Sequence, residues 1–348
     1  MKKLFSLALL TLMMVASRSF AQSSLLATLS HEGEISTFYG ANALKNAHSK
    51  AVAGDAITLS SGTFVATNIT KPIILRGAGM VLDSINNIAP TIIAGDFTIN
   101  VTNTDNAKLT IEGIYNSSTI SILGLLTNAT FLKCRFKEIN FTEGSGPVTN
   151  LLVIHCKVVD RLSVLGGSSI TMINSYLKDV IGYRHETIYC QFENCVLYWS
   201  GDNLYAGHAN YTQHISAIGN STFKNCIIFP TPNDNNHIIP ASSSAYNCIS
   251  FKSSTFQNIP NTTNSFVTGW DTIFKTFRGT YNDLESFELT DAAKAKYKGT
   301  DGTEVGIHGG SLPFSATPSN PQITKCNVAA KSTADGKLSV DIEVAGAE

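Results

Sequence analysis

The pattern of hydrophobic and polar positions repeats a short unit, whose clearest copy is Phe192-Glu193-Asn194-Cys195-Val196-Leu197. The unit has an apolar residue, a spacer, a polar residue, a small residue and then alternating apolar positions. The small residue recurs at positions 134, 156, 175, 195, 226 and 248, so the steps are 22, 19, 20, 31 and 22 residues. A period near twenty residues with one longer step is typical of a solenoid.

Each unit predicts two short strands joined by a sharp corner. Asn precedes the small residue in four of the six copies and His155 does so in a fifth, and both residue types tolerate a positive φ. Alternation beyond the corner, as at Cys195 and Leu197, indicates a strand with one buried face. Stacking such units about 4.8 Å apart pairs their backbones. The pattern therefore predicts an all-β, right-handed, single-stranded parallel β-helix.

The same step continues upstream with glycine as the small residue, at Gly77, Gly95 and Gly113, so we expect about nine or more coils. Residues 40–53 predict an amphipathic helix, with Leu44, Ala47 and Ala51 on one stripe. A solenoid has to cover its open end, and this helix stands at the position of an N-terminal cap.

The first residues predict a signal peptide over 1–21. A charged Met1-Lys2-Lys3 precedes an apolar run to Ala16, and Ser19-Phe20-Ala21 is a small-x-small cleavage site. We therefore expect a secreted or cell-surface protein that begins at Gln22, with a stop-transfer anchor as the alternative. No later apolar run is long enough to span a membrane.

The composition changes after Pro313. Residues 317–321 predict a linker, and the segments 322–328 and 337–344 predict two strands that pair across a turn at 334–336. The expected organisation is a signal peptide at 1–21, a capped β-helix at 22–315, and a linker with a short β tail at 316–348. The tail is interpreted as a cap, an attachment element or part of a further β domain.

Charge and cysteine content bear on the class of partner and on the state of the thiols. The formal net charge is −1 and 15% of residues are charged, which argues against a nucleic-acid partner because such proteins carry a basic stripe. Five of the seven cysteines occupy the small-residue column. We expect them to point inward as buried free thiols, because an in-register ladder rarely offers the disulfide dihedral. A disulfide between adjacent coils is the alternative.

Two motifs resemble a known family. The opening combines the helix with Gly-Asp-x-Ile-x-Leu at 54–59, Ser-Gly-Thr-Phe at 61–64 and Lys-Pro-Ile-x-Leu-Arg-Gly-Ala-Gly at 71–79. It resembles the opening of secreted pectate-lyase-like β-helix proteins, and residues 299–310 resemble the closing segment of such proteins exported by Bacteroidetes bacteria. The resemblance implies the fold and export. It does not imply one activity, because this fold has many functions.

The 31-residue step contains an insertion with aromatic and polar residues that suit a sugar ring: Trp199, Asp202, Tyr205, His208 and Tyr211. The alternative is a loop packed for stability. The preceding coil adds Lys178, Asp179, Arg184 and His185, with Arg184 and His185 expected at a corner beside the insertion.

Counting four residues past the small position places Glu138, Asp160 and Asp179 in one column. Stacked carboxylates repel unless a cation neutralises them. Calcium is one candidate, because the resemblance to pectate lyases implies it, and a solvated column with Arg161 and Lys178 as counter-ions is the other.

No catalytic residue stands out. Arg161, Lys178 or Arg184 could act as the base of a lyase, but their spacing distinguishes none of them. The Asn-Thr-Asp, Asp-Asp and Gly-His-Gly motifs of polygalacturonase-like enzymes are absent, and Gly207-His208-Ala209 matches only in part. The leading hypothesis is a monomeric carbohydrate-associated protein that binds a glycan or serves as a scaffold. The alternatives are a polysaccharide lyase or hydrolase, and an adhesin with protein partners.

Overall fold

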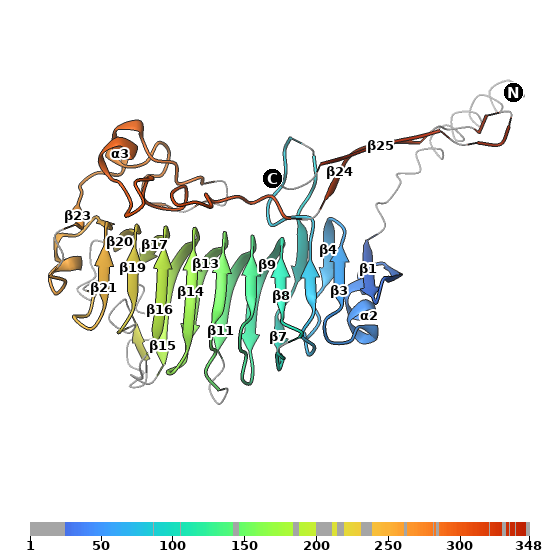
Figure 1. Cartoon of the computed structure of the whole chain (residues 1–348), viewed down its shortest axis with the longest axis horizontal. Coiled ribbons are helices and arrows are strands. Elements are labelled where there is room, and N and C mark those ends of the chain that lie inside the picture. The colour runs from blue at the N-terminus through green and yellow to red at the C-terminus, as the bar shows by residue number, and fades with distance from the viewer. Residues whose placement is uncertain are drawn as a thin grey trace, which may run out of the picture.

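The computed structural model describes residues 25–345, except for 86, 105, 142–145, 184–187, 200–210, 214–218, 231–238, 261–262, 281, 283–284, 320, 329–331, 334 and 338. Within these residues the chain is an elongated parallel β-solenoid made of two long sheets (Figure 1). This confirms the predicted fold class. The right-handed sense of the coil stays a prediction.

The first sheet, sheet A, carries the strand that precedes each corner. Its strands, in spatial order, are β2 Glu34–Tyr39, β1 Leu26–His31, β3 Ala56–Leu59, β5 Ile74–Arg76, β8 Thr110–Glu112, β10 Thr130–Leu132, β12 Leu151–Ile154, β14 Ser169–Ile173, β16 Tyr189–Glu193, β19 Thr222–Lys224 and β21 Ser244–Tyr246. From β3 onward every neighbouring pair is parallel, as stacked coils require.

Sheet B carries the strand that follows each corner. Its main path is β23 Ser265–Phe266, β22 Ile249–Ser250, β20 Ile227–Pro230, β17 Val196–Trp199, β15 Tyr176–Tyr183, β13 Lys157–Val164, β11 Arg135–Phe141, β9 Ile114–Ile122, β6 Thr91–Ala94 and β4 Gly62–Val65. Two further strands join it off this path: β7 Phe97–Ile99 pairs with β9, and β18 Tyr211–Gln213 pairs with β15.

The coils from β8–β9 to β21–β22 share one construction, with a left-handed residue at or just before the corner. Counting the pairs β8–β9, β10–β11, β12–β13, β14–β15, β16–β17, β19–β20 and β21–β22 gives seven such coils among the described residues. Two less regular coils, built from β3–β4 and β5–β6, precede them, and a long excursion after Gly77 separates the two strands of the second one. The expected count of about nine therefore corresponds to seven regular coils and two irregular ones.

The corner residues have the conformation that the pattern predicted. φ is +51° or more at His155, Asn194, Asn225 and Asn247, and +44° at Asn174. Lys133 has the same conformation, with φ of +52°. Asn tolerates this region better than other non-glycine residues because its short polar side chain can hydrogen-bond locally.

The column of small residues lies inside the solenoid. Its five cysteines are free and at most 1% exposed: Cys134, Cys156, Cys195, Cys226 and Cys248. Burial raises the pKa of the Cys134, Cys226 and Cys248 thiols well above its ordinary value, so these thiols stay protonated fillers of the core. The prediction of buried free thiols is confirmed for this column.

The N-terminal end differs from the prediction. The helix is α2, Ala43–Lys50, which is shorter than the expected 40–53. The chain leaves the helix at Ala51, where ψ is 153°, and a positive φ of +87° at Gly40 precedes it. The sequence interpretation also missed the antiparallel hairpin β1–β2, which adds two strands to sheet A beyond β3. Ala43, Leu44 and Ala47 pack into the main core beside it.

The region after the last coil folds back onto the outer face of sheet B. This C-terminal lobe, residues 267–297, contains the 3-10 turn η3 Trp270–Thr272 and helix α3 Asp291–Lys296; a second 3-10 turn, η2 Ser253–Phe256, precedes it. Phe229 of β20 is fully buried beneath the lobe, and its ring meets those of Trp270, Phe274 and Phe277. The outer face of sheet B therefore has a hydrophobic core of its own.

The strap, residues 298–319, then runs back along the row of corners from the last coil towards the first (Figure 1). Asn247 donates to the carbonyl of Lys298, Asn174 donates to those of Ile307 and Gly309, and the Glu112 carboxylate accepts from the N–H of Ser319. Pro318 is buried. The first part of the expected linker is thus docked on the solenoid.

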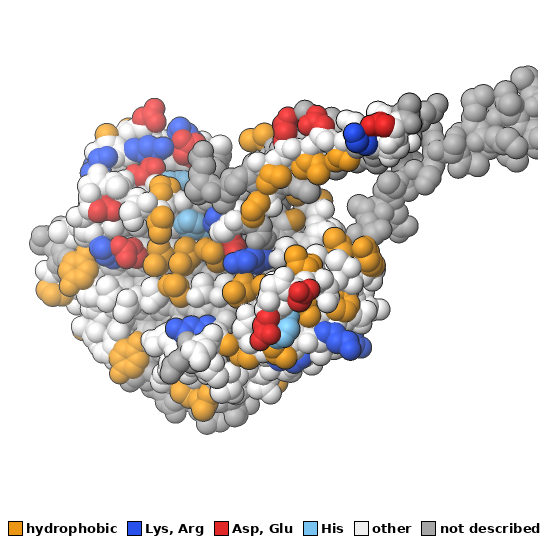
Figure 2. Space-filling view, turned by 45° about the vertical axis from the view of Figure 1, so that its right-hand side comes forward, with side chains coloured by type: hydrophobic (Ala, Val, Ile, Leu, Met, Phe, Trp, Pro, Cys, Tyr) orange, Lys and Arg blue, Asp and Glu red, His pale blue; other side chains and the backbone are white. Residues whose placement is uncertain are grey.

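The strands β24 Gln322–Val328 and β25 Val340–Ala345 form the predicted hairpin, which projects past the N-terminal end of the solenoid (Figure 1). Val340, Ile342 and Val344 are half exposed and form an apolar row, which Figure 2 shows in orange along the projecting segment. Among the described residues, no helix is long and apolar enough to span a membrane.

Candidate functional site

Charged side chains gather on three neighbouring strands of sheet B, beyond the edge of the C-terminal lobe. We call this set the charge ladder; it consists of Glu138 on β11, Asp160 and Arg161 on β13, and Lys178 and Asp179 on β15. The flanking residues Phe136, Ile139, Val158, Leu162, Leu177 and Val180 are all buried in the core. The alternation therefore anchors the backbone and directs the charged side chains outward.

The ladder does not stack carboxylates as the residue count predicted. Arg161 pairs in register with Glu138 on one side and with Asp179 on the other. The reason is an irregularity: two residues lie between Val158 and Arg161, whereas one lies between the equivalent positions on β11 and β15. This extra residue places Asp160 beside the column and puts a guanidinium between the two carboxylates.

The ladder is an ion-pair network. Arg161 Nε lies 3.5 Å from Glu138 Oε1, and Arg161 Nη2 lies 3.7 Å from Asp160 Oδ2. Lys178 Nζ is 4.0 Å from Asp160 Oδ1, and the Thr119 hydroxyl donates to Glu138 Oε2. The Arg161 and Glu138 side chains are each 15% exposed. A half-buried network holds its members in fixed positions better than an isolated surface pair does.

The insertion returns to the sheet next to this network. Trp199 ends β17, and after the insertion β18 pairs antiparallel with the end of β15, with Tyr211 opposite Tyr183 and Gln213 opposite Ile181. This places the end of the insertion two residues beyond Asp179. The side chains of Trp199 and Tyr211 are not described, and Arg184, His185, Asp202, Tyr205 and His208 lie outside the described residues.

Among the residues that the structure describes, no three His, Cys, Asp or Glu side chains converge to hold a metal ion. Glu138, Asp160 and Asp179, the expected calcium ligands, belong to this part of the chain. Each of the first two faces a cation instead, so the calcium hypothesis gains no support from their geometry.

Two buried cations beside the ladder escaped the sequence interpretation. Arg135 is 9% exposed and lies 4.3 Å above the ring of Tyr115, and Lys157 is 5% exposed and donates to the Glu285 carbonyl. Both occupy the position directly after the small residue. In later coils this position is apolar, at Val196 and Ile227, and packs into the hydrophobic core beneath the lobe. In the sequence, the position after the small residue changes from basic residues in the earlier coils to apolar ones in the later coils. This change could have pointed to the buried cations.

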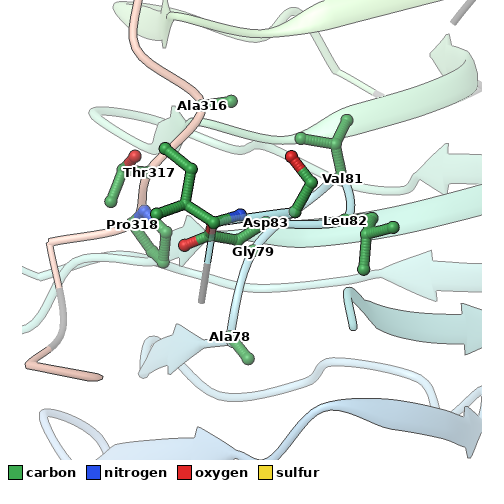
Figure 3. Close-up of a pocket in the computed structure, with 10 residues that line it drawn as sticks. Ala78, Gly79, Val81, Leu82, Asp83, Ala316, Thr317 and Pro318 are labelled. Carbon is green, nitrogen blue, oxygen red and sulfur yellow. The ribbon is translucent and has the colours of Figure 1, made fainter. Parts of the chain in front are cut away.

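The end of the strap forms a pocket with the excursion after Gly77. Its volume is about 320 Å³, within the range of small-ligand sites. Figure 3 shows Val81 and Leu82 on one side, Thr317 and Pro318 on the other, and Gly79 and Asp83 between them. Nothing in the sequence pattern indicated this pocket, because its two walls are more than 200 residues apart in the chain.

Comparison with known proteins gives no match among family models, curated proteins or solved structures. The fold therefore defines the class: a parallel β-solenoid, consistent with the pectate-lyase-like fold that the opening motif resembles.

Proposed function

We propose that the protein is an exported, carbohydrate-associated β-helix protein that binds an extended glycan along sheet B without cleaving it. The charge ladder carries this proposal. It offers donors and acceptors on three successive coils, and sugar hydroxyls need both kinds of partner. A repeated protein surface suits a ligand that is itself repetitive, and solenoids use such extended surfaces for binding.

The insertion supports the same proposal. Because β18 pairs with the end of β15, the insertion borders the ladder, and aromatic residues there can stack on the apolar face of a sugar. Binding is favoured over hydrolysis because Glu138 and Asp160 both pair with Arg161, whereas a glycosidase needs two carboxyl groups that flank the scissile bond.

The test is affinity electrophoresis of the mature protein through gels that contain single acidic or neutral polysaccharides. We expect one class to retard the protein, and we expect Arg161→Gln to weaken the binding by about tenfold or more, since hydrogen bonds to charged groups contribute about 1.5–3 kcal/mol. The matched control is Lys224→Gln, which breaks an ion pair with Glu193 on sheet A, away from the ladder.

The same samples decide between binding and cleavage. Incubation with calcium or with a chelator, followed by absorbance of unsaturated uronides and by release of reducing ends, detects a lyase or a hydrolase. Product formation would replace the binding proposal with an enzymatic one. Equal retardation of wild type and Arg161→Gln would remove the ladder from the proposal. N-terminal sequencing of the exported protein tests the leader, with Gln22 as the expected first residue.

A further inference from the structure

The strand β2 ends sheet A at the N-terminal end of the molecule. It pairs with β1 on one side, and no other described strand pairs with its outer side. Ile35, Thr37 and Tyr39 share one face of this strand and are exposed, Ile35 by 70% and Tyr39 by 65%. Such an edge presents unpaired backbone groups to solvent.

The hydrogen bonds of the β1–β2 hairpin show which backbone N–H and C=O groups of β2 point outward. Gly40 N–H donates to the Leu25 carbonyl, so the pair 25–40 is a hydrogen-bonded pair of β1 and β2. Ser60 N–H donates to the Leu26 carbonyl, so the intervening residues of β1 bond to β3. Because the two kinds of pair alternate along antiparallel strands, the N–H and C=O groups of Ile35, Thr37 and Tyr39 point away from β1.

Within β2 itself, the described residues have none of the sequence features that usually block edge pairing. All six residues of β2 pair with β1 in continuous register without a bulge, and the strand contains no lysine, arginine or proline. Its one charged residue, Glu34, stands at the end of the strand.

The edge is also complementary to itself. In an antiparallel pair of two copies with Thr37 opposite Thr37, each Ile35 lies opposite the Tyr39 of the other copy. These are favourable cross-strand pairs: aromatic with β-branched on both sides and threonine with threonine at the centre. Glu34 then faces Gly40, so no like charges meet.

We propose that β2 pairs antiparallel with β2 of a second copy, with Thr37 on the twofold axis, and joins two solenoids end to end through a continuous sheet A. The contact is isologous, so it closes at a dimer. It is independent of the glycan proposal and replaces the expectation of a monomer. Because one strand per copy makes a small interface, the dimer is expected to be reversible and concentration-dependent.

The position of Thr37 on the axis allows a sharp test. Sedimentation velocity of the mature wild-type protein should show a rise from monomer to dimer with concentration. Thr37→Lys places two lysines opposite each other, and Thr37→Glu places two glutamates there; each variant alone should dimerise about tenfold more weakly or worse. An equimolar mixture of the two should dimerise again, because a lysine then faces a glutamate across the axis.

The matched control is Gln191→Lys, which adds the same charge at an exposed site on the central strand β16 and should leave dimerisation unchanged. Circular dichroism of each variant establishes that it is folded, which the exposure of Thr37 leads us to expect. A wild-type protein that stays monomeric at the highest concentration overturns the proposal. So does a dimer that either Thr37 variant leaves intact, or a mixture that remains monomeric.

Discussion

Several residues that precede the corners both set the backbone conformation and hold the strap. Asn174 turns the backbone with a φ of +44°, and its Nδ2 donates to the carbonyls of Ile307 and Gly309 at 2.8 and 2.7 Å. Asn225 adopts a φ of +56°, and its Oδ1 accepts from the N–H of Thr300. The backbone of these asparagines forms the left-handed corner, and their side chains form the hydrogen bonds to the strap. Mutation can therefore separate the contributions of the corner and of the hydrogen bonds to stability.

Asn174→Ala and Asn174→Gly make this separation. Both remove the two hydrogen bonds to the strap and leave the buried Gly309 carbonyl without its amide donor, which costs about 1–3 kcal/mol of unfolding free energy; the Ile307 carbonyl keeps its bond from the Phe314 N–H. Alanine also disfavours the left-handed backbone, by about 1–2 kcal/mol, whereas glycine does not. We therefore expect the alanine variant to be the less stable of the two in urea denaturation. Equal stabilities would show that the corner conformation contributes little.

At the corner of the first regular coil the left-handed residue is a glycine, and its role is to leave space for the neighbouring backbone and the strap. Gly113 has a φ of +66°, and a Cβ there would lie 2.9 Å from the Gly77 carbonyl oxygen and 3.1 Å from Cβ of Pro318. The strap thus meets side-chain amides at the corners of later coils, and a corner glycine beside the Glu112 carboxylate on the first regular coil.

At the scale of elements, the attachment of the strap to β12–β13 depends on a histidine. His155 Nε2 lies 2.9 Å from the Leu312 carbonyl oxygen and donates to it when protonated at that atom, and its ring lies beside Phe314. Burial, together with the positive charge of Lys133, lowers the pKa of His155 below its ordinary 6.5. The unfolded chain therefore binds a proton more readily than the folded one.

This shift gives the pH dependence a definite sign. The unfolding free energy should fall as the pH drops below about 6.5, and His155 should contribute no pH dependence above that value. His155→Asn keeps a corner residue and an amide donor but cannot be protonated. We expect urea midpoints of the wild type and the variant to agree at pH 7.5 and to diverge at pH 5, with the variant more stable. His48, whose pKa burial also lowers, is common to both proteins.

Elements with a local pattern were predictable from the sequence, and elements defined by partners were not. The corners, the cysteine column and the tail hairpin follow from residues close together in the chain. The hairpin β1–β2 has too short an alternation to distinguish it from loop. The irregular residue before Arg161 is invisible to a count from the small position, because alternation on both sides of it continues unchanged.

The residues of the candidate site could be predicted from the sequence, but the ion pairs between them could not. The sequence placed Asp160, Arg161, Lys178 and Asp179 near one another, and the structure brings them together on β13 and β15. Their ion pairs depend on the register between strands, which a single residue changes. The buried cation Lys157 depends on the lobe and the strap, because it contacts Glu285 and Phe314, more than 100 residues distant in sequence.

At the scale of the whole molecule, the strap changes how the solenoid is held together. A repeat protein contacts only its neighbours, and its stability is a sum of local terms. Here Asn174 meets a residue 135 positions later and Glu112 meets one 207 positions later. These contacts join the last coils to the first and should make unfolding more cooperative.

A chain that ends at Gly310 tests this coupling. It keeps the lobe but loses the contacts of His155 with Leu312 and of Glu112 with Ser319. We expect a loss of about 2–5 kcal/mol, from one hydrogen bond to a charged group, one neutral one and the packing of Phe314 and Pro318. Hydrogen exchange should rise in β8–β13 before it rises in the later coils. Uniform exchange along the solenoid would mean that the strap adds no coupling.

The strap also constrains how such a protein can lengthen. Solenoids grow when the gene for one coil is duplicated, and each new coil moves the two ends about 4.8 Å further apart. An extended strap covers about 3.3 Å per residue, so every duplicated coil calls for one or two additional residues in a segment encoded far downstream. Evolution of size in this architecture therefore requires paired changes at two separate places in the gene. The chain folded into the turns at 299–302 and 306–309 is the extra length that the strap can release before the second change is needed.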